Sequence, residues 1–308
     1  MILVVLAIIA STAVGAGAEH RYGARAQRFS RGLIDAMVWV LLPFVVFFIV
    51  ARLHFGGGVG VGLLLGFVEL AIVGVLAERV GTKVLKLPRP SVGALVLLVI
   101  LANTGYLGIP LTAALLGHDA LAPAIAWDSI VSQLMLYLAG FAVGAAYGTE
   151  AGETPRQRIR AFLTRNPVLW AMLAGLAAPD ALAPDAIVDV ARFIAAYAVL
   201  PLGFFILGVN LMSEREDGVF GFPPPLTPPV GVALALRLAV APLLMLLLSS
   251  LLLGEMPDAY LVQAAMPSGI NALIVGHLYG TDLRLAASGI VWTTIVGVTI
   301  ALAASPFI

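Results

Sequence analysis

The chain has 308 residues, of which 61% are hydrophobic and 11% are charged, and its mean hydropathy is +1.05. These values exclude a soluble globular enzyme and indicate an integral membrane protein, because ordinary soluble domains are about 45 to 50% apolar. Seventeen basic and seventeen acidic residues cancel, and cysteine is absent. We therefore expect no nucleic-acid partner, no metal site and no cofactor.

Apolar runs of about 20 residues, the length that crosses a bilayer, recur along the whole chain and leave no room for a soluble domain. Charged residues and clusters of Gly and Pro separate them. The pattern predicts an all-α membrane protein with ten spans. The predicted spans lie near residues 2–18, 33–53, 57–79, 91–117, 121–147, 167–183, 186–212, 229–253, 257–279 and 283–306.

The loops predict the orientation. With these spans, 14 Lys and Arg residues fall in loops on one side, and two, Arg52 and Arg192, fall on the other. Basic residues concentrate in cytoplasmic loops, so both termini should lie outside. The first run ends in a sequence, AGA at 16–18, that resembles a signal-peptidase site, but no Lys or Arg precedes the run. We therefore expect a membrane span there and not a cleaved signal peptide.

The two halves of the sequence look duplicated. LLPFVVFFI in the second predicted span matches VLPLGFFIL in the seventh, and another proline follows 67 residues later in the first half and 66 residues later in the second. Five spans per half is an odd number, so the second copy must enter the membrane from the opposite face. The sequence thus predicts two inverted repeats, residues 1–147 and 167–308, joined by a cytoplasmic linker at 148–166.

Helix-breaking residues interrupt the fourth and ninth predicted spans. The fourth contains NTGYLGIPL at 103–111, and the ninth contains AAMPSGIN at 264–271. Pro110 and Pro267 each remove a helical hydrogen bond. Irregular backbone at this depth is tolerated only where it packs in protein or lines a wet cavity. We therefore predict two broken helices that cross near the midplane at these prolines and present half-helix ends to a solute.

Two asparagines accompany the predicted breaks. From the predicted directions of the spans, Asn103 and Asn271 should lie on the cytoplasmic side of the crossover, about 10 and 6 Å from it, and face one pocket. The alternative for any intramembrane proline is a simple kink, which we expect for Pro43, Pro201 and Pro242.

NTGYLGIPL, RLAVAPL at 237–243 and MPSGINALIVGHLYGTD at 266–282, with Asn166-Pro167, resemble the auxin efflux carrier family, in its bacterial branch of PIN-like organic-anion permeases. The resemblance covers almost the whole chain. It implies the bile-acid sodium symporter and NhaA-like fold in the bacterial inner membrane. It also implies a scaffold of helices 1, 2, 6 and 7 that often forms a homodimer, and a transport unit of helices 3–5 and 8–10 that moves like an elevator.

The resemblance also implies that a substrate carboxylate binds at the crossover. By motif matching, that role goes to Asn103, Pro110, Pro267 and Asn271. The predicted substrate site also includes their neighbours Thr104, Tyr106, Met266 and Ser268. Plant members carry a long hydrophilic loop between the halves, where this chain has only residues 148–166, so auxin itself and control by phosphorylation are not implied. The bacterial branch is associated with malate, malonate and similar small carboxylates, and nothing in the sequence chooses among them.

Ionisable residues within predicted spans are costly and need a partner, a neutral state or water. Asp128, followed by Ser132 and Gln133, is either a carboxyl that lines the pocket or couples protons, or an Asp that is hydrogen-bonded into helix packing. Glu69 has no polar neighbour within a turn, so it is a coupling site or a lone protonated residue. Arg237 either attracts an anionic substrate or, as we favour, extends to the cytoplasmic interface.

The sequence carries none of the zinc-protease or phosphate-loop motifs that would indicate an enzyme. The main hypothesis is therefore a secondary carrier of small organic anions. The alternatives are an ion channel and a cation/proton antiporter of the same general fold. Paired breaks in inverted repeats favour alternating access over a continuous pore.

Overall fold

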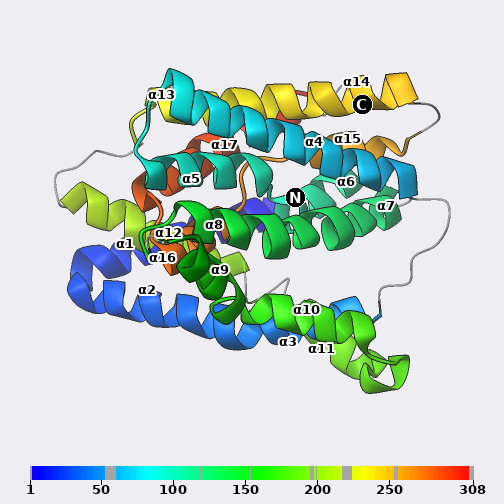
Figure 1. Ribbon diagram of the computed structural model, residues 1–308, viewed down its shortest axis with the longest axis horizontal. Helices are drawn as coiled ribbons and strands as arrows, with labels where there is room; N and C mark the ends of the chain where they lie inside the picture. The colour runs from blue at the N-terminus through cyan, green and yellow to red at the C-terminus, as the bar shows by residue number, and fades with distance from the viewer. Residues whose placement is uncertain are drawn as a thin grey trace. The chain divides into compact units, whose positions relative to one another are not determined.

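The computed structural model describes residues 2–52, 60–117, 120–150, 152, 154–194, 198, 200–216, 224–252 and 256–304. Among them, the regular structure is helical apart from one isolated bridge between extended segments. The chain folds into two compact units (Figure 1). Unit 1 comprises Met1–Val4, Gly57–Glu150 and Phe222–Ile308, and unit 2 comprises Val5–Gly56 and Ala151–Gly221.

Unit 2 is a bundle in which α10 and α11 pack on α3, and α2 packs on α12. A Cβ on Gly208 would lie 2.1 Å from the carbonyl oxygen of Thr12, so α1 and α12 cross at backbone contact, as small residues allow in membrane helices. The helices of unit 2 are α1 (Ile2–Tyr22, from Val5 onward), α2 (Ala24–Ala36), η1 (Met37–Leu41), α3 (Leu42–Ala51), α9 (Pro155–Thr164), α10 (Pro167–Ala177), η7 (Asp180–Leu182), α11 (Asp185–Ile194) and α12 (Leu200–Glu216).

Unit 1 holds the interrupted segments. Its long helices α4 and α14 lie side by side (Figure 1). The helices of unit 1 are α4 (Gly60–Arg79), η2 (Val80–Val84), α5 (Arg89–Ile100), η3 (Thr104–Gly108), α6 (Ile109–Leu116), α7 (Leu121–Ala126), η5 (Trp127–Ser132), η6 (Met135–Gly140), α8 (Phe141–Tyr147), α13 (Pro228–Ala235), η9 (Leu236–Val240), α14 (Ala241–Leu252), α15 (Asp258–Ala264), α16 (Asn271–Tyr279) and α17 (Leu283–Ala304).

Five helical stretches among the described residues are long and apolar enough to cross a membrane. They are Ala24–Ala51, Gly60–Val84, Pro123–Tyr147, Pro228–Leu251 and Leu283–Ala301. Shorter apolar helices cover Arg89–Ile100, Pro167–Ala177 and Pro201–Ser213. The chain is therefore an all-helical, multi-pass membrane protein, while ten spans in inverted repeats remain a prediction. The predicted seventh span, 186–212, corresponds to two helices, α11 and α12, with residues 195–197 and 199 outside the described part.

Three π-helical segments, η1, η3 and η9, each end two residues before a proline. The prolines are Pro43, Pro110 and Pro242. A proline cannot donate to the preceding turn, and in membrane helices local π-type turns can satisfy the backbone groups that a proline leaves free. All three prolines thus lie inside continuous helical stretches.

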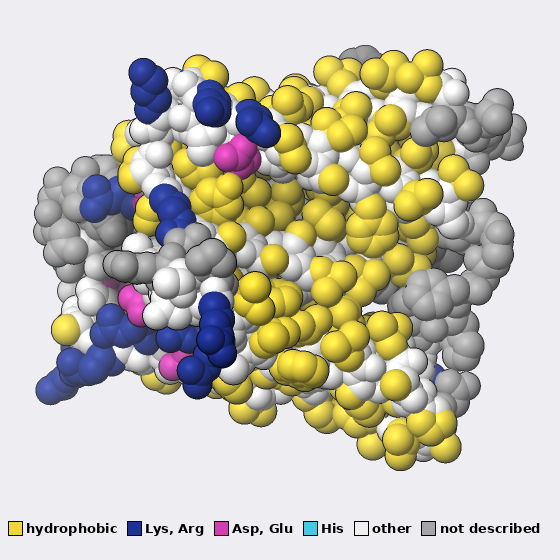
Figure 2. Space-filling model, in the orientation of Figure 1, with side chains coloured by type: hydrophobic (Ala, Val, Ile, Leu, Met, Phe, Trp, Pro, Cys, Tyr) yellow, Lys and Arg dark blue, Asp and Glu magenta, His cyan; other side chains and the backbone are white. Residues whose placement is uncertain are grey.

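The surface of unit 1 suits a bilayer. On the face shown in Figure 2, apolar side chains cover its helices, and Lys and Arg gather where α4 passes through η2 into α5. The exposed apolar residues of the unit include Val61, Leu64, Val75, Leu243, Leu247 and Leu251. The basic residues of this stretch are Arg79, Lys83, Lys86 and Arg89. Apolar helix faces with charges at helix ends are typical of membrane spans.

A buried cluster joins α4 to η5, α14 and α15. The rings of Trp127 and Tyr260 lie 5.2 Å apart between their centroids, and both side chains are almost fully buried. The apolar members of the cluster are Leu63, Leu65, Leu70, Trp127, Val131, Met245, Tyr260 and Ala264. This packing positions the buried side chain of Glu69 and the end of α15 in the interior of unit 1.

Candidate substrate-binding crossover

The two interrupted segments meet through their extended backbones. Helix α5 ends at Ile100 and η3 begins at Thr104, while α15 ends at Ala264 and α16 begins at Asn271. Ala102 and Ser268 form an antiparallel bridge between the two breaks. On either side of this bridge, the Asn103 N–H donates to the Pro267 carbonyl at 2.7 Å, and the Gly269 N–H donates to the Leu101 carbonyl at 2.6 Å. The fourth and ninth predicted spans are therefore both broken, and they cross.

The predicted position of the first break was wrong. Pro110 lies in α6, and the interruption falls seven or more residues earlier, at Leu101–Asn103. The π-helical turn η3 accommodates the proline, so the helix continues past it. In the second segment, Pro267 does lie within the break. Asn103 consequently sits at the crossover and not about 10 Å from it, as ideal helical rise from Pro110 had predicted.

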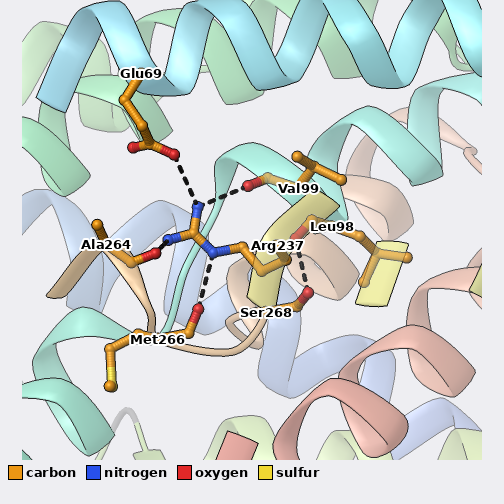
Figure 3. A network of polar contacts seen from close by, with 7 residues as sticks. All are labelled: Glu69, Leu98, Val99, Arg237, Ala264, Met266 and Ser268. Carbon is orange, nitrogen blue, oxygen red and sulfur yellow. Dashed lines mark hydrogen bonds and ion pairs between the residues drawn. The ribbon is translucent and has the colours of Figure 1, made fainter. Parts of the chain in front are cut away.

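Arg237 occupies the centre of the crossover and comes from η9 (Figure 3). Its side chain is 1% exposed. Nη1 donates to the Val99 carbonyl at 3.0 Å, Nη2 to the Ala264 carbonyl at 2.5 Å, and Nε to the Met266 carbonyl at 2.8 Å. The interpretation that Arg237 extends to the cytoplasmic interface is therefore wrong, because backbone acceptors hold the guanidinium inside the protein.

Glu69 on α4 is the counter-ion of Arg237. Its Oε1 lies 3.9 Å from Nη1, and its side chain is fully buried. Within the described residues, neither carboxylate oxygen accepts a hydrogen bond. Of the two predicted roles, the lone residue is therefore wrong, because the partner of Glu69 comes from a segment 168 positions away in the sequence. The coupling role stays a prediction.

Ser268 uses its hydroxyl to hold the crossover together. Oγ donates to the Leu98 carbonyl at 2.7 Å, and the Ser268 N–H donates to Thr293 Oγ1 on α17 at 3.2 Å. Thr293 was not among the predicted site residues. In the sequence, Thr293 stands out only as a polar residue in an apolar run, where it is followed by a second threonine. This pattern does not indicate that Thr293 contacts Ser268.

Asn103 combines a satisfied acceptor with an unused donor. Its Oδ1 accepts a bond from the Leu107 N–H at 3.3 Å and so caps η3. Its Nδ2 is buried and makes no hydrogen bond within the part of the chain that the structure describes. The residue is only 4% exposed. An unpaired buried amide is costly, so it marks a place where a ligand acceptor is expected.

Asp128 lies against the first turn of η3. Its Oδ1 accepts a hydrogen bond from Thr104 Oγ1 at 2.5 Å, and a Cβ on Gly105 would lie 3.1 Å from the same oxygen. Gln133 also makes a side-chain hydrogen bond with Asp128, and its Oε1 accepts a bond from the Tyr137 hydroxyl at 2.5 Å. Ser132 is half-buried on the same π-helical segment as Asp128. The carboxyl therefore belongs to the crossover region, and both roles predicted for it remain compatible with its position.

The other predicted site residues are placed as follows. Met266 is buried in an apolar cluster with Leu107 and Leu111. Pro110 and Asn271 are half-buried, the latter as the first residue of α16. The side chain of Tyr106 lies outside the described part of the structure.

Gln263 is a buried polar residue that the sequence pattern did not single out. Its Nε2 donates to Thr112 Oγ1 at 3.2 Å. Its Oε1 is buried and accepts no hydrogen bond from the described residues. A Cβ on Gly108 would lie 2.3 Å from this oxygen, so Gln263 lies directly against η3. The sequence signal that could have identified it is a single Gln within an apolar segment, four residues before Pro267.

The bridge geometry predicts that cysteines at positions 102 and 268 will form a disulfide. Directly opposed residues of this non-hydrogen-bonded type have Cα atoms about 4.5 Å apart, within the range of a disulfide. The chain has no native cysteine, so Ala102→Cys with Ser268→Cys should give one linked peptide pair by mass spectrometry after mild oxidation. Each single variant serves as a control. Failure of the pair to link in folded protein would contradict the crossover.

Crossing, discontinuous helices buried in an all-helical unit define a class of multi-pass membrane protein that handles solutes within the bilayer. The chain belongs to the membrane transport protein family, whose sequence model matches residues 1–303. This is the family of auxin efflux carriers that its motifs resemble. An uncharacterized transporter of Methanocaldococcus jannaschii is 26% identical over 286 residues, which cover 89% of this chain and 88% of that protein.

Proposed function

We propose that the chain is a secondary carrier of small organic anions such as malate or malonate. The observation that supports this most directly is the buried, unpaired Nδ2 of Asn103 at the crossover. It lies beside the N-terminal end of η3, whose first N–H groups have no acceptor within the helix. An amide donor next to a helix N-terminus favours a carboxylate as ligand.

The polarity of the crossover supports an anion over a cation. Two half-helices begin there, at Thr104 and Asn271, and two end there, at Ile100 and Ala264. N-terminal ends carry partial positive charge and C-terminal ends partial negative charge. Arg237 already donates to carbonyls at both C-terminal ends. The N-terminal ends, which carry partial positive charge, therefore remain available to a solute. A carboxylate bound between Asn103 and Asn271 would suit this arrangement.

Asp128 is the proposed pocket carboxyl. A substrate anion near Thr104 would be repelled by a charged carboxylate there, whereas a protonated Asp128 would remove that repulsion. We therefore infer that a proton accompanies the anion at this residue. Glu69, paired with Arg237, serves as a counter-ion in this scheme and not as the coupling site.

An elevator-type mechanism is supported by how the chain divides. Unit 1 contains the third to fifth and eighth to tenth predicted spans, and unit 2 contains the first, second, sixth and seventh. We propose that unit 1 carries the substrate and that unit 2 is a scaffold through which two copies dimerise. With the predicted loop charges, both termini would lie outside the cytoplasmic membrane of a bacterial cell.

Counterflow in proteoliposomes tests the proposal. Vesicles loaded with unlabelled malonate or malate should take up the labelled compound transiently above equilibrium, with a saturable initial rate. This overshoot arises only when a carrier exposes its binding site alternately to the two faces of the membrane. A non-saturating electrical current without counterflow would favour the channel, and exchange of Na⁺ or K⁺ for protons without carboxylate transport would favour the antiporter.

A further inference from the structure

Several backbone acceptors at the ends of α5 and α15 have an identified donor within the crossover. The Leu97 carbonyl accepts from the Leu101 N–H, and the Leu98 carbonyl from Ser268 Oγ. In the second segment, the Gln263 carbonyl accepts from the Met266 N–H. The last carbonyls of a helix normally lack partners, and burial in a membrane makes that costly.

Three further acceptors in these two segments converge on one side chain. The carbonyls of Val99, Ala264 and Met266 all point at the guanidinium of Arg237 (Figure 3). Carbonyl oxygens from half-helix ends are the ligands with which discontinuous helices hold an alkali-metal cation. Here a positive group of the protein itself takes that position.

We propose that Arg237 is a built-in cation, a positioning residue that locks the two half-helix ends together in place of a bound Na⁺ or K⁺. Glu69 neutralises this charge, so the pair adds no net charge to the interior. The crossover of the native protein therefore holds its shape independently of alkali-metal ions. Removal of the guanidinium exposes three carbonyls that accept a small cation from solution.

The side chain must be arginine for this role. Its planar fork directs three N–H groups from different nitrogens to acceptors in two segments far apart in the sequence, at Val99 on one side and Ala264 and Met266 on the other. A lysine ammonium carries its donors on a single atom, so it cannot span the same separation.

Thermal unfolding of the purified full-length protein in detergent tests the proposal. The probes are NaCl, KCl and guanidinium chloride at about 10 mM, each against choline chloride at equal ionic strength. The native Tm should be the same in all four salts. Arg237→Ala should lower the Tm by roughly 5 °C or more, since it leaves a buried carboxylate and three carbonyls unpaired. Guanidinium should restore at least half of that loss, and choline should restore none.

Two further variants keep the result interpretable. Arg237→Lys retains the charge, and its Tm should fall between those of the native protein and Arg237→Ala, with no rescue by guanidinium. If Arg237→Ala does not fold, the Tm of Arg237→Lys is compared with that of the native protein in its place. Arg79→Ala, at an exposed arginine of the same unit, should leave the Tm within about 1 °C.

Three outcomes would overturn the proposal. They are a native Tm that rises specifically with Na⁺ or K⁺, equal rescue of Arg237→Ala by choline, and an Arg237→Lys variant as stable as the native protein.

A transport measurement tests the same proposal, and it rests on the proposed function. Carboxylate uptake by the native protein should be equal in Na⁺ and choline media. Sodium-dependent uptake would refute the built-in cation but not the carrier, whereas absence of carboxylate uptake would refute the carrier and leave the unfolding result valid.

Discussion

Asn103→Asp should reduce the initial rate of carboxylate uptake by about 100-fold or more at subsaturating substrate. The substitution keeps the shape of the side chain and the oxygen that caps η3 through the Leu107 N–H. It replaces the unpaired Nδ2 donor with a second oxygen, so a carboxylate would meet an acceptor in place of a donor. A 100-fold reduction corresponds to a loss of about 2.7 kcal/mol in the binding free energy of the substrate. Repulsion between the substrate carboxylate and a buried carboxylate at position 103 is large enough to cause this loss.

Asn166→Asp is the matched control. Asn166 is also buried, and its Oδ1 caps α10 by accepting a bond from the Leu169 N–H at 2.9 Å. It belongs to unit 2, which contributes none of the crossover segments. Uptake per folded protein should stay within about twofold of the native rate, because surface and cap changes outside a site act mainly through stability. Native uptake by Asn103→Asp would remove Asn103 from the substrate site.

Asn271→Asp extends the same measurement to the second half. Asn271 is half-buried as the first residue of α16, where a carboxylate side chain suits a helix N-terminus and preserves the fold. Its uptake should fall in the same direction as that of Asn103→Asp. A severe loss in one variant with native uptake in the other would show that the two half-helices do not share a ligand.

The sequence was sufficient to predict that two segments break and meet, because a cluster of Gly, Pro and Asn residues within an apolar run weakens a continuous helix. It was not sufficient to locate the first break. Whether a chain stops at a proline or widens its turn and continues depends on what satisfies the backbone around it. At Leu101–Asn103 the hydrogen-bond partners are the Pro267 carbonyl and the Gly269 N–H, in the other half of the sequence.

The partners of Arg237 illustrate a different limit. All three acceptors are backbone carbonyls, and every residue type presents the same carbonyl group. No side-chain pattern therefore points from Val99 or Ala264 to an arginine. The ion pair with Glu69 was open to sequence reasoning, since two opposite charges within predicted spans each need a partner. Pairing them would have predicted the buried position of Arg237.

Gly269→Val should lower the Tm by roughly 5 °C or more and abolish uptake. A Cβ at this position would lie 3.0 Å from the Ala102 carbonyl oxygen and 3.3 Å from the Asn103 nitrogen, in the opposite strand of the crossover. The φ angle of Gly269 is not in the left-handed region, so glycine is needed there for space. A β-branched side chain must separate the two backbones and stretch the bond from the Gly269 N–H to the Leu101 carbonyl.

Gly231→Val separates this crowding from the general effect of adding a valine to unit 1. Apart from its chain neighbours and the nearby backbone of its own helix, no heavy atom lies within 4 Å of a Cβ built on Gly231, which is in α13. Valine costs a helix only a few tenths of a kcal/mol relative to the best helix formers, so the Tm and the uptake rate should stay close to native. The comparison is decisive because both variants add the same three carbons. If Gly269→Val unfolded and transported like Gly231→Val, the two breaks would not approach each other at backbone contact, and half-helix ends so far apart could not enclose a single carboxylate.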